Sequence, residues 1–310
     1  MDTAEIKDRR VRFDFEIDFS NGGTLQGQDF RLDLAGEDIA DEDLATYLVR
    51  DLGLLMVGAV RILNKEIIVE RHKRSAATSQ PTQGNRTRID LSHTVEDGMI
   101  TYRGLPAPVI CDFLSREESH SHYASGTEFQ IGQINMCSNT GTYVDSPFQR
   151  YADGTDLAGL PLDRLAELDA IVINLSGSAE RAIDRTHLLP YDVPGKAVLV
   201  HTGWDRHWRT DAYFENHPFL TESAARHLVD VNAALVGIDS LNIVGIDSLN
   251  IDDTSDGRRP VHSTLLAAGI PICEHMTNLS AVPTSGSRFS AVPVKVKGMG
   301  TFPVRAYATL

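Results

Sequence analysis

Hydrophobic and charged residues alternate near the start of the chain. From residue 11 to residue 19 every second residue is Val, Ile or Phe, and the residues between them are charged. A period of two is typical of a half-buried β-strand. The tetrapeptide Ser20-Asn21-Gly22-Gly23 then predicts a hairpin turn, and the alternation resumes at residues 30–34 on a partner strand.

The next segment changes to helical spacing. Asp41 or Asp43 can cap a helix whose apolar residues recur on one face. Two apolar runs on either side of Asn64-Lys65 predict a second hairpin. Residues 1–70 are therefore predicted to form a small ββαββ module. Because its core is small, we expect it to pack against the main domain or a partner subunit, or else to bind a ligand of its own.

A polar linker and a larger domain follow. Residues 71–88 are rich in Ser, Thr, Gln and Gly, which favours a linker. Residues 89–310 contain short apolar runs typical of buried strands, at 170–175, 197–201 and 234–239. They alternate with segments of helical periodicity, so this part is predicted to be an α/β domain.

Composition and charge argue against several classes of function. A chain of 310 residues can bury a sizeable core. Its net charge of −14 and the lack of a dense basic patch argue against a nucleic-acid partner. Without a membrane-length apolar run or a secretory segment, and with three cysteines not spaced as CxxC, the sequence predicts a cytoplasmic protein that does not bind membranes.

The stretch from residue 139 to residue 151 is the strongest candidate for chemistry. Gly141 permits backbone shapes with positive φ, and Pro147 fixes φ and lacks an N–H donor. Together they predict a stiff loop that could hold Asp145 against a substrate or a metal ion. A plain turn is the alternative.

This stretch resembles the signature of the cyclase family, which includes bacterial kynurenine formamidases and isatin hydrolases. The family pattern is His-x-Gly-Thr-His-x-Asp-x-Pro-x-His, whose histidines and aspartate bind divalent metal. The chain keeps the four other defining residues, Gly141, Thr142, Asp145 and Pro147. The resemblance covers roughly residues 88–310, and it implies a twisted, partly closed β-sheet flanked by helices.

The chain departs from the pattern at the histidines. Asn139, Tyr143 and Gln149 stand at the three histidine positions of the signature. In contrast, His262 and Glu274 match the distal histidine and glutamate ligands of the family. Without the resemblance, a structural His–Glu pair between a helix and a strand would be the simpler interpretation.

The resemblance implies two metal positions. The first would have Asp145 as its only charged ligand and no imidazole, which is poor for Zn²⁺ or Mn²⁺. The second, with Asp145, Gln149, His262 and Glu274, could hold one such ion weakly. We favour the alternative in which no metal is bound tightly.

In the metal-free alternative, the same residues form an acid–base cluster. Asp145 or Glu274 would orient His262, which would deprotonate water or a substrate group near neutral pH. Tyr143 would donate a hydrogen bond to the developing oxyanion.

Further residues are candidates for substrate contact. Asn139 and Gln149 are included because of their signature positions. His120 and His122 could share one strand face and line the same cleft, although a solvated loop is the interpretation we favour. The resemblance implies that the loop containing Trp204 borders the pocket; the alternative is that this indole plugs the edge of the core.

An eight-residue segment occurs twice in succession. Residues 236–243 and 244–251 have the same sequence, Val-Gly-Ile-Asp-Ser-Leu-Asn-Ile, which suggests a tandem duplication. Because eight is even, either copy would present the same faces to a sheet. We expect one copy to form a strand and the other to leave the sheet as a loop near the cleft or a subunit interface.

These observations lead to one function with two alternatives. We expect hydrolysis of an amide-type C–N bond in a small aryl formamide or cyclic amide, with water activated at an Asp/His/Glu cluster. The alternatives are metal-independent cyclase, dehydratase or lyase chemistry in the same pocket, and a non-catalytic binding protein. We expect a homo-oligomer, either a dimer or a tetramer, that binds a small-molecule substrate.

Overall fold

The structure is a computed structural model. It describes residues 8–20, 22–34, 36–70, 86–102, 104–240, 251–253 and 257–310. The chain divides into two compact units, residues 1–86 with 186–192 and residues 87–185 with 193–310. The predicted linker lies almost wholly outside the described residues, so the domain boundaries proposed from the sequence stay a prediction.

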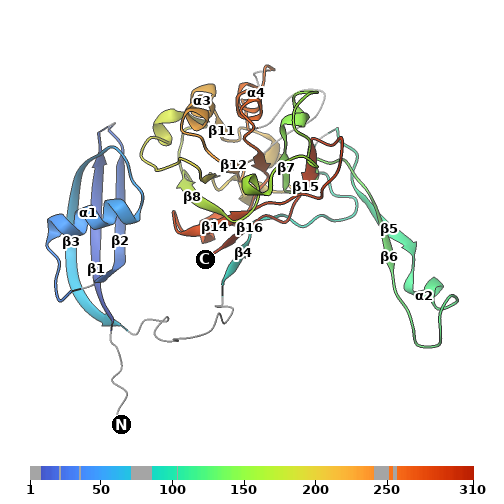
Figure 1. The fold of residues 1–310 in the computed structure, drawn as a ribbon, viewed down its shortest axis with the longest axis horizontal. Helices are drawn as coiled ribbons and strands as arrows, with labels where there is room; N and C mark the ends of the chain where they lie inside the picture. The colour runs from blue at the N-terminus through green and yellow to red at the C-terminus, as the bar shows by residue number, and fades with distance from the viewer. Residues whose placement is uncertain are drawn as a thin grey trace, which may run out of the picture. The chain divides into compact units, whose positions relative to one another are not determined.

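In its described residues, the first unit contains an antiparallel sheet with a helix packed against it (Figure 1). Within its described residues the elements are β1 (Asp8–Phe19), β2 (Thr24–Leu34), α1 (Asp41–Asp51) and β3 (Val57–Glu70), with strand order β2-β1-β3. The alternating apolar residues of β1 are buried with Leu44 and Leu48 of α1. The N-cap of α1 is Ala40 and has no side-chain cap, so Asp41 and Asp43 lie in the first turn instead of capping it, where their charge favours the helix N-terminus.

The second predicted hairpin of this unit does not form. β3 runs through Asn64 and Lys65 as one strand and pairs with β1 along its length. Asn64 has a φ of 50°, the pairing register shifts beside it, and its amide donates a hydrogen bond of 2.7 Å to Asp14. The two apolar runs share one long partner strand, so the turn-forming residues are accommodated as a bulge.

The second unit is organised around a mixed sheet that curls into a half-barrel. Among the described residues its strand order is β15-β7-β13-β12-β10-β8-β14-β16-β4. The apolar runs predicted from the sequence form the parallel centre, and the flanking strands are antiparallel. The strands are β4 (Arg88–Asp90), β7 (Tyr143–Asp145), β8 (Leu168–Asn174), β10 (Ala197–His201), β12 (Leu235–Ile238), β13 (Ile272–Glu274), β14 (Ser287–Ser290), β15 (Thr301–Pro303) and β16 (Tyr307–Thr309). The predicted α/β class is confirmed.

Two helices, α3 (Glu222–Asp230) and α4 (Pro260–Ala267), lie side by side on one face of this sheet (Figure 1). Thr221 caps α3 by accepting the N–H of Ala224, and Pro260 begins α4. No described helix is long and apolar enough to cross a membrane. The short elements are β9 (Ala182–Ile183), β11 (Phe219–Leu220), and the 3₁₀-helices η1 (Pro147–Gln149), η2 (Leu162–Arg164), η3 (Arg185–His187), η4 (Trp204–His207), η5 (Asp211–Phe214) and η6 (Leu279–Ala281).

A two-stranded arm projects from the second unit (Figure 1). It consists of β5 (Val109–Leu114), the short helix α2 (Arg116–Ser119) and β6 (Ile131–Asn135). A capping box between Ser115 and Glu118 starts α2. Both strands are largely exposed, and the side chain of Phe113 is 71% exposed.

The first copy of the repeat begins inside β12. A side chain at Gly237 would lie 2.7 Å from the sulfur of Met276 and 2.8 Å from Leu199, so glycine lets these two side chains pack against the strand. The second copy has glycine at the equivalent position, which is consistent with either copy filling the strand. Residues 241–250 lie outside the described residues, so the expected surplus loop stays a prediction.

Candidate functional site

Strand β7 contains Tyr143 and Asp145 of the signature and is paired on both sides. It lies between β13 and β15, and Tyr143 pairs with Glu274 across the β7–β13 ladder. Side chains alternate along a strand, so Tyr143 and Asp145 lie on one face of β7, and Glu274 shares that face. Val144 points the other way, into the hydrophobic core.

The loop before β7 is tied to neighbouring segments. Gly141 has a φ of 68°, and a side chain there would lie 2.9 Å from Val95. The hydroxyl of Thr142 donates a hydrogen bond to the carbonyl of His275 and accepts one of 3.0 Å from the N–H of His93. These contacts hold the loop that precedes Tyr143. The prediction of one stiff loop over residues 139–151 is wrong in part, because Asp145 lies in strand β7 and Pro147 begins η1.

His262 lies in the first turn of helix α4, where the carboxylate of Asp252 holds it in place. Asp252 accepts hydrogen bonds from the backbone N–H groups of Val261 and His262. It also accepts a hydrogen bond of 2.9 Å from Nδ1 of the His262 ring. One carboxylate therefore begins the helix and fixes the rotation of the imidazole, which leaves Nε2 facing the sheet.

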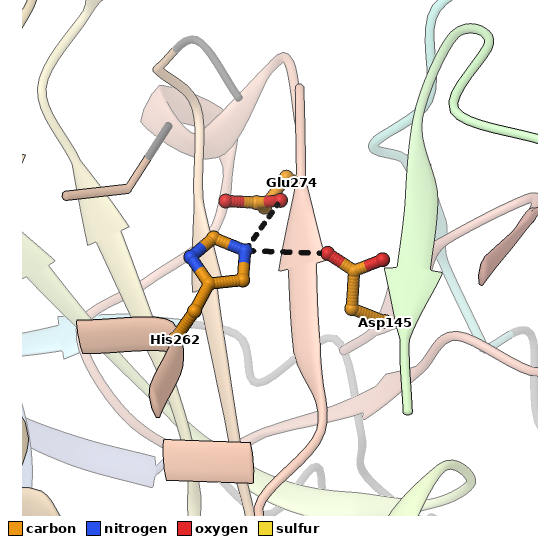
Figure 2. Close-up of side chains that lie close together, drawn as sticks. All are labelled: Asp145, His262 and Glu274. Carbon is orange, nitrogen blue, oxygen red and sulfur yellow. Dashed lines mark ion pairs between the residues drawn. The ribbon is translucent and has the colours of Figure 1, made fainter. Parts of the chain in front are cut away.

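Asp145, His262 and Glu274 come together as one buried group, which we call the site cluster (Figure 2). Both carboxylates approach the same ring nitrogen: Nε2 of His262 is 3.4 Å from Asp145 and 3.7 Å from Glu274. All three side chains are fully buried. The hydroxyl of Thr301, on β15, donates a hydrogen bond to Asp145 and holds that carboxylate in place.

The electrostatics of the cluster favour positive charge. Burial and the charge of Arg259 lower the pKa of His262, but Glu274, Asp145 and Asp252 raise it more, to about 10. Burial raises the pKa of Glu274 to about 8, although the nearby histidine lowers it. A proton on the imidazole and a cation at Nε2 would compete for the same negative surroundings.

The donors fit a divalent cation at one of the two positions. The site cluster offers one imidazole nitrogen and two carboxylates whose ligand atoms lie within 4.8 Å of one another. The bond from His262 to Asp252 is the outer contact that metal-binding histidines commonly make. The other position, with an amide at Asn139 and a phenol at Tyr143, does not offer such donors.

Several buried polar atoms around the cluster have no hydrogen-bond partner among the described residues. They are Asn139 Nδ2, Tyr143 Oη, Gln149 Oε1, Arg259 Nε and Nη2, His262 Nε2 and Glu274 Oε2. Burial and the charges of Glu274 and Asp145 raise the pKa of Tyr143 well above its ordinary value. Buried polar atoms normally have partners, so this concentration of unpaired atoms is typical of a ligand site.

Other residues predicted to contact substrate lie elsewhere in this chain. Trp204, at the start of η4, donates its indole N–H to the carbonyl of Tyr213 at 3.0 Å. It lines a pocket of about 260 Å³ whose described lining includes no member of the site cluster. His120 and His122 are exposed on the arm, where His120 contacts Glu128.

Sequence reasoning missed two residues of the site, Asp252 and Arg259. Asp252 follows the repeat and precedes His262 by ten positions, so no short motif joins them. The available signal was an acidic residue between a buried strand and the helix that contains a candidate ligand. Arg259 adjoins Arg258 and carries no motif that would have identified it.

The chain is similar in sequence to a known family and to several known proteins. The family described as "Putative cyclase" matches residues 89–252. Kynurenine formamidase from Geobacillus thermodenitrificans (strain NG80-2) is 28% identical over 185 residues, which cover 59% of this chain and 81% of that protein. Kynurenine formamidase from Bacillus cereus is 26% identical over 220 residues, which cover 70% of this chain and 95% of that protein.

Solved structures show the same fold. Isatin hydrolase A from Ralstonia solanacearum has a TM-score of 0.60 and 20% identity, covering 76% of this chain and 100% of that chain. A structure described as "Potential Metal-Dependent Hydrolase With Cyclase Activity" has a TM-score of 0.57 and 24% identity, covering 72% of this chain and 98% of that chain. The family match spans more than half of the sequence, and this chain belongs to the cyclase family.

Proposed function

We propose that this chain hydrolyses an amide-type C–N bond in a small aryl formamide or cyclic amide. The observation that carries the proposal is the convergence of Asp145, His262 and Glu274 on one point inside a fully buried site. Relatives named kynurenine formamidase and isatin hydrolase support this class of reaction.

Some residues of the site can act on the attacking water, and Tyr143 can act on the substrate carbonyl. The carboxylates of Asp145 and Glu274 can orient a water molecule beside Nε2 of His262 and accept its proton. Asp252 keeps the imidazole in the required rotation. The hydroxyl of Tyr143 shares a strand face with Asp145 and can donate a hydrogen bond to the oxyanion formed from the amide carbonyl.

A cation is compatible with this arrangement at one position. Asp145, His262 and Glu274, with the side-chain carbonyl of Gln149, would hold it. When bound, it would polarise the amide carbonyl and make water more acidic. We propose that the affinity for Zn²⁺ or Mn²⁺ is low, because Asn139 and Tyr143 replace the imidazoles of the adjoining position.

The test is turnover of formanilides and lactams by the full chain, with and without added Zn²⁺ or Mn²⁺, measured as formate release or ring opening. We expect His262→Ala and Glu274→Ala each to lower kcat/KM by a factor of roughly 10²–10⁴. His227→Ala, on the half-buried surface of α3, is the matched control and should leave turnover unchanged.

Two results would contradict the proposal. Normal turnover in either site variant would show that the cluster is not the reactive centre. Binding of the panel without turnover, under all metal conditions, would favour a non-catalytic binding protein.

A further inference from the structure

Arg259 has an unusual backbone position at the entrance to helix α4. It is the N-cap residue, and its φ of 54° and ψ of 59° lie in the left-handed region. Non-glycine residues rarely adopt this conformation unless their surroundings hold them there. Arg259 and His262 therefore both lie at the N-terminal end of α4.

The guanidinium of Arg259 has an unused donor edge. Its Nε and Nη2 atoms are buried, and neither has a hydrogen-bond partner among the described residues. These two nitrogens form the side of the guanidinium that donates two parallel N–H groups. A buried charged donor without a partner is costly, so this edge is expected to meet a ligand.

Arg259 lies close to the site cluster, and the described residues include no ion pair between its guanidinium and the cluster. Its charge acts on three buried groups, Tyr143, His262 and Glu274, which places the guanidinium near all of them. The Oε2 atom of Glu274 also lacks a described hydrogen-bond partner. The guanidinium edge of Arg259 is therefore available to a third molecule beside the site cluster.

We propose that Arg259 binds a carboxylate group through its Nε–Nη2 edge, so that the site accepts carboxylate-bearing amides or retains a carboxylate product. Two parallel N–H donors match the two oxygens of a planar carboxylate. A doubly charged phosphate would be repelled more strongly by Asp145, Asp252 and Glu274. That this carboxylate lies beside a hydrolysed amide rests on the proposed function. Carboxylate binding itself does not depend on turnover.

Binding of benzoate to the full chain tests the proposal without catalysis. Isothermal titration calorimetry would compare benzoate with its neutral isostere benzamide, in the parent, Arg259→Met and Arg259→Lys. We expect benzoate to bind the parent more tightly than benzamide, and Arg259→Met to weaken benzoate binding roughly 10- to 100-fold. Arg259→Lys keeps the charge but loses the paired donors, so its affinity should be intermediate.

A matched control is the neighbouring arginine. Arg258 is exposed, and Arg258→Met should leave benzoate binding unchanged. Melting temperatures of all variants would show that each is folded at the temperature of titration.

Two substrates distinguish the source of the carboxylate. If Arg259 binds a carboxylate already present on the substrate, Arg259→Met raises KM for 2-formamidobenzoate and not for formanilide. If it binds the carboxylate released by hydrolysis, Arg259→Met abolishes product inhibition by formate and leaves both KM values unchanged. Either result supports carboxylate binding by Arg259.

The proposal is overturned if folded Arg259→Met binds benzoate as tightly as the parent, or if the parent binds benzamide or inorganic phosphate at least as tightly as benzoate. Loss of turnover in His262→Ala without loss of benzoate binding would leave the carboxylate site standing. Carboxylate binding with no hydrolysis of any amide would contradict only the proposed function.

Discussion

Replacing Asp252 with alanine should destabilise the second unit through the first turn of α4. The carboxylate is fully buried and accepts the backbone N–H groups of Val261 and His262. Each buried backbone donor left without an acceptor costs about 1–3 kcal/mol. Two such donors predict a loss of about 2–6 kcal/mol, a large share of the roughly 5–15 kcal/mol that stabilises a typical protein.

The same substitution should also impair activity. Asp252 accepts a hydrogen bond from Nδ1 of His262, so its removal frees the imidazole to rotate. Loss of an outer contact of this kind typically costs 10–100-fold in metal affinity or activity, so we expect a fall of about 10- to 100-fold in kcat/KM. Asp252→Asn keeps one acceptor oxygen, and its loss of stability should be smaller.

Intrinsic fluorescence during urea unfolding is a suitable assay. The sequence contains two tryptophans, Trp204 and Trp208, and both lie in the second unit. Their signal therefore reports on the unit that contains Asp252. The exposed Glu117→Ala is a control and should change the free energy of unfolding by less than about 0.5 kcal/mol. An Asp252→Ala variant with the stability and turnover of the parent would refute the reasoning.

Three further predictions concern metal, pH and packing. Metal analysis of the purified chain should find well under one equivalent of Zn or Mn, and restoring histidine at the signature positions should raise it (Asn139→His, Tyr143→His and Gln149→His together). Burial lowers the pKa of His93 from 6.5 to about 4, so the unfolded chain takes up this proton first as pH falls. Stability from this residue is therefore complete above pH 6.5 and declines toward pH 4, by about 2–3 kcal/mol. Gly300→Ala should lower the free energy of unfolding by about 1–3 kcal/mol, because its Cβ would lie 2.5 Å from backbone atoms of Gln149.

Each of these predictions can be contradicted by a specific result or checked against a control variant. Stoichiometric metal that survives dialysis would contradict the first. For the second, His93→Gln should flatten the pH dependence of unfolding between pH 6.5 and 4, and an unchanged slope would count against it. For the third, Gly132→Ala is the matched substitution, because a Cβ added there would meet no atom of the described residues within 4 Å.

The hydrophobic pattern predicted which segments form strands better than it predicted which strands pair with one another. The apolar runs that became β8, β10 and β12 were identified because strands buried on both faces are continuously apolar. The second hairpin of the first unit was predicted wrongly because Asn64-Lys65 is as compatible with a bulge as with a turn. The choice depends on the length of β1, which a local pattern does not contain.

The candidate site was partly predictable for a similar reason. The resemblance located Asp145, His262 and Glu274, and the structure brings all three together. Asp252 and Arg259 were missed because their roles arise from the path of the chain into α4, and no residue spacing encodes that path. The contribution of His120 and His122 to substrate binding stays a prediction.

The position of β7 has a consequence for the order in which the site cluster assembles. Asp145 is held by Thr301, a residue 156 positions further along the chain, and it pairs with a strand that follows His262. Contacts of such long sequence separation form late, because the intervening chain must first lose its freedom. During synthesis the site cluster is therefore incomplete until β13 and β15 have both been made. A fragment that ends before residue 301 would contain every member of the site cluster and still lack the strand that closes it.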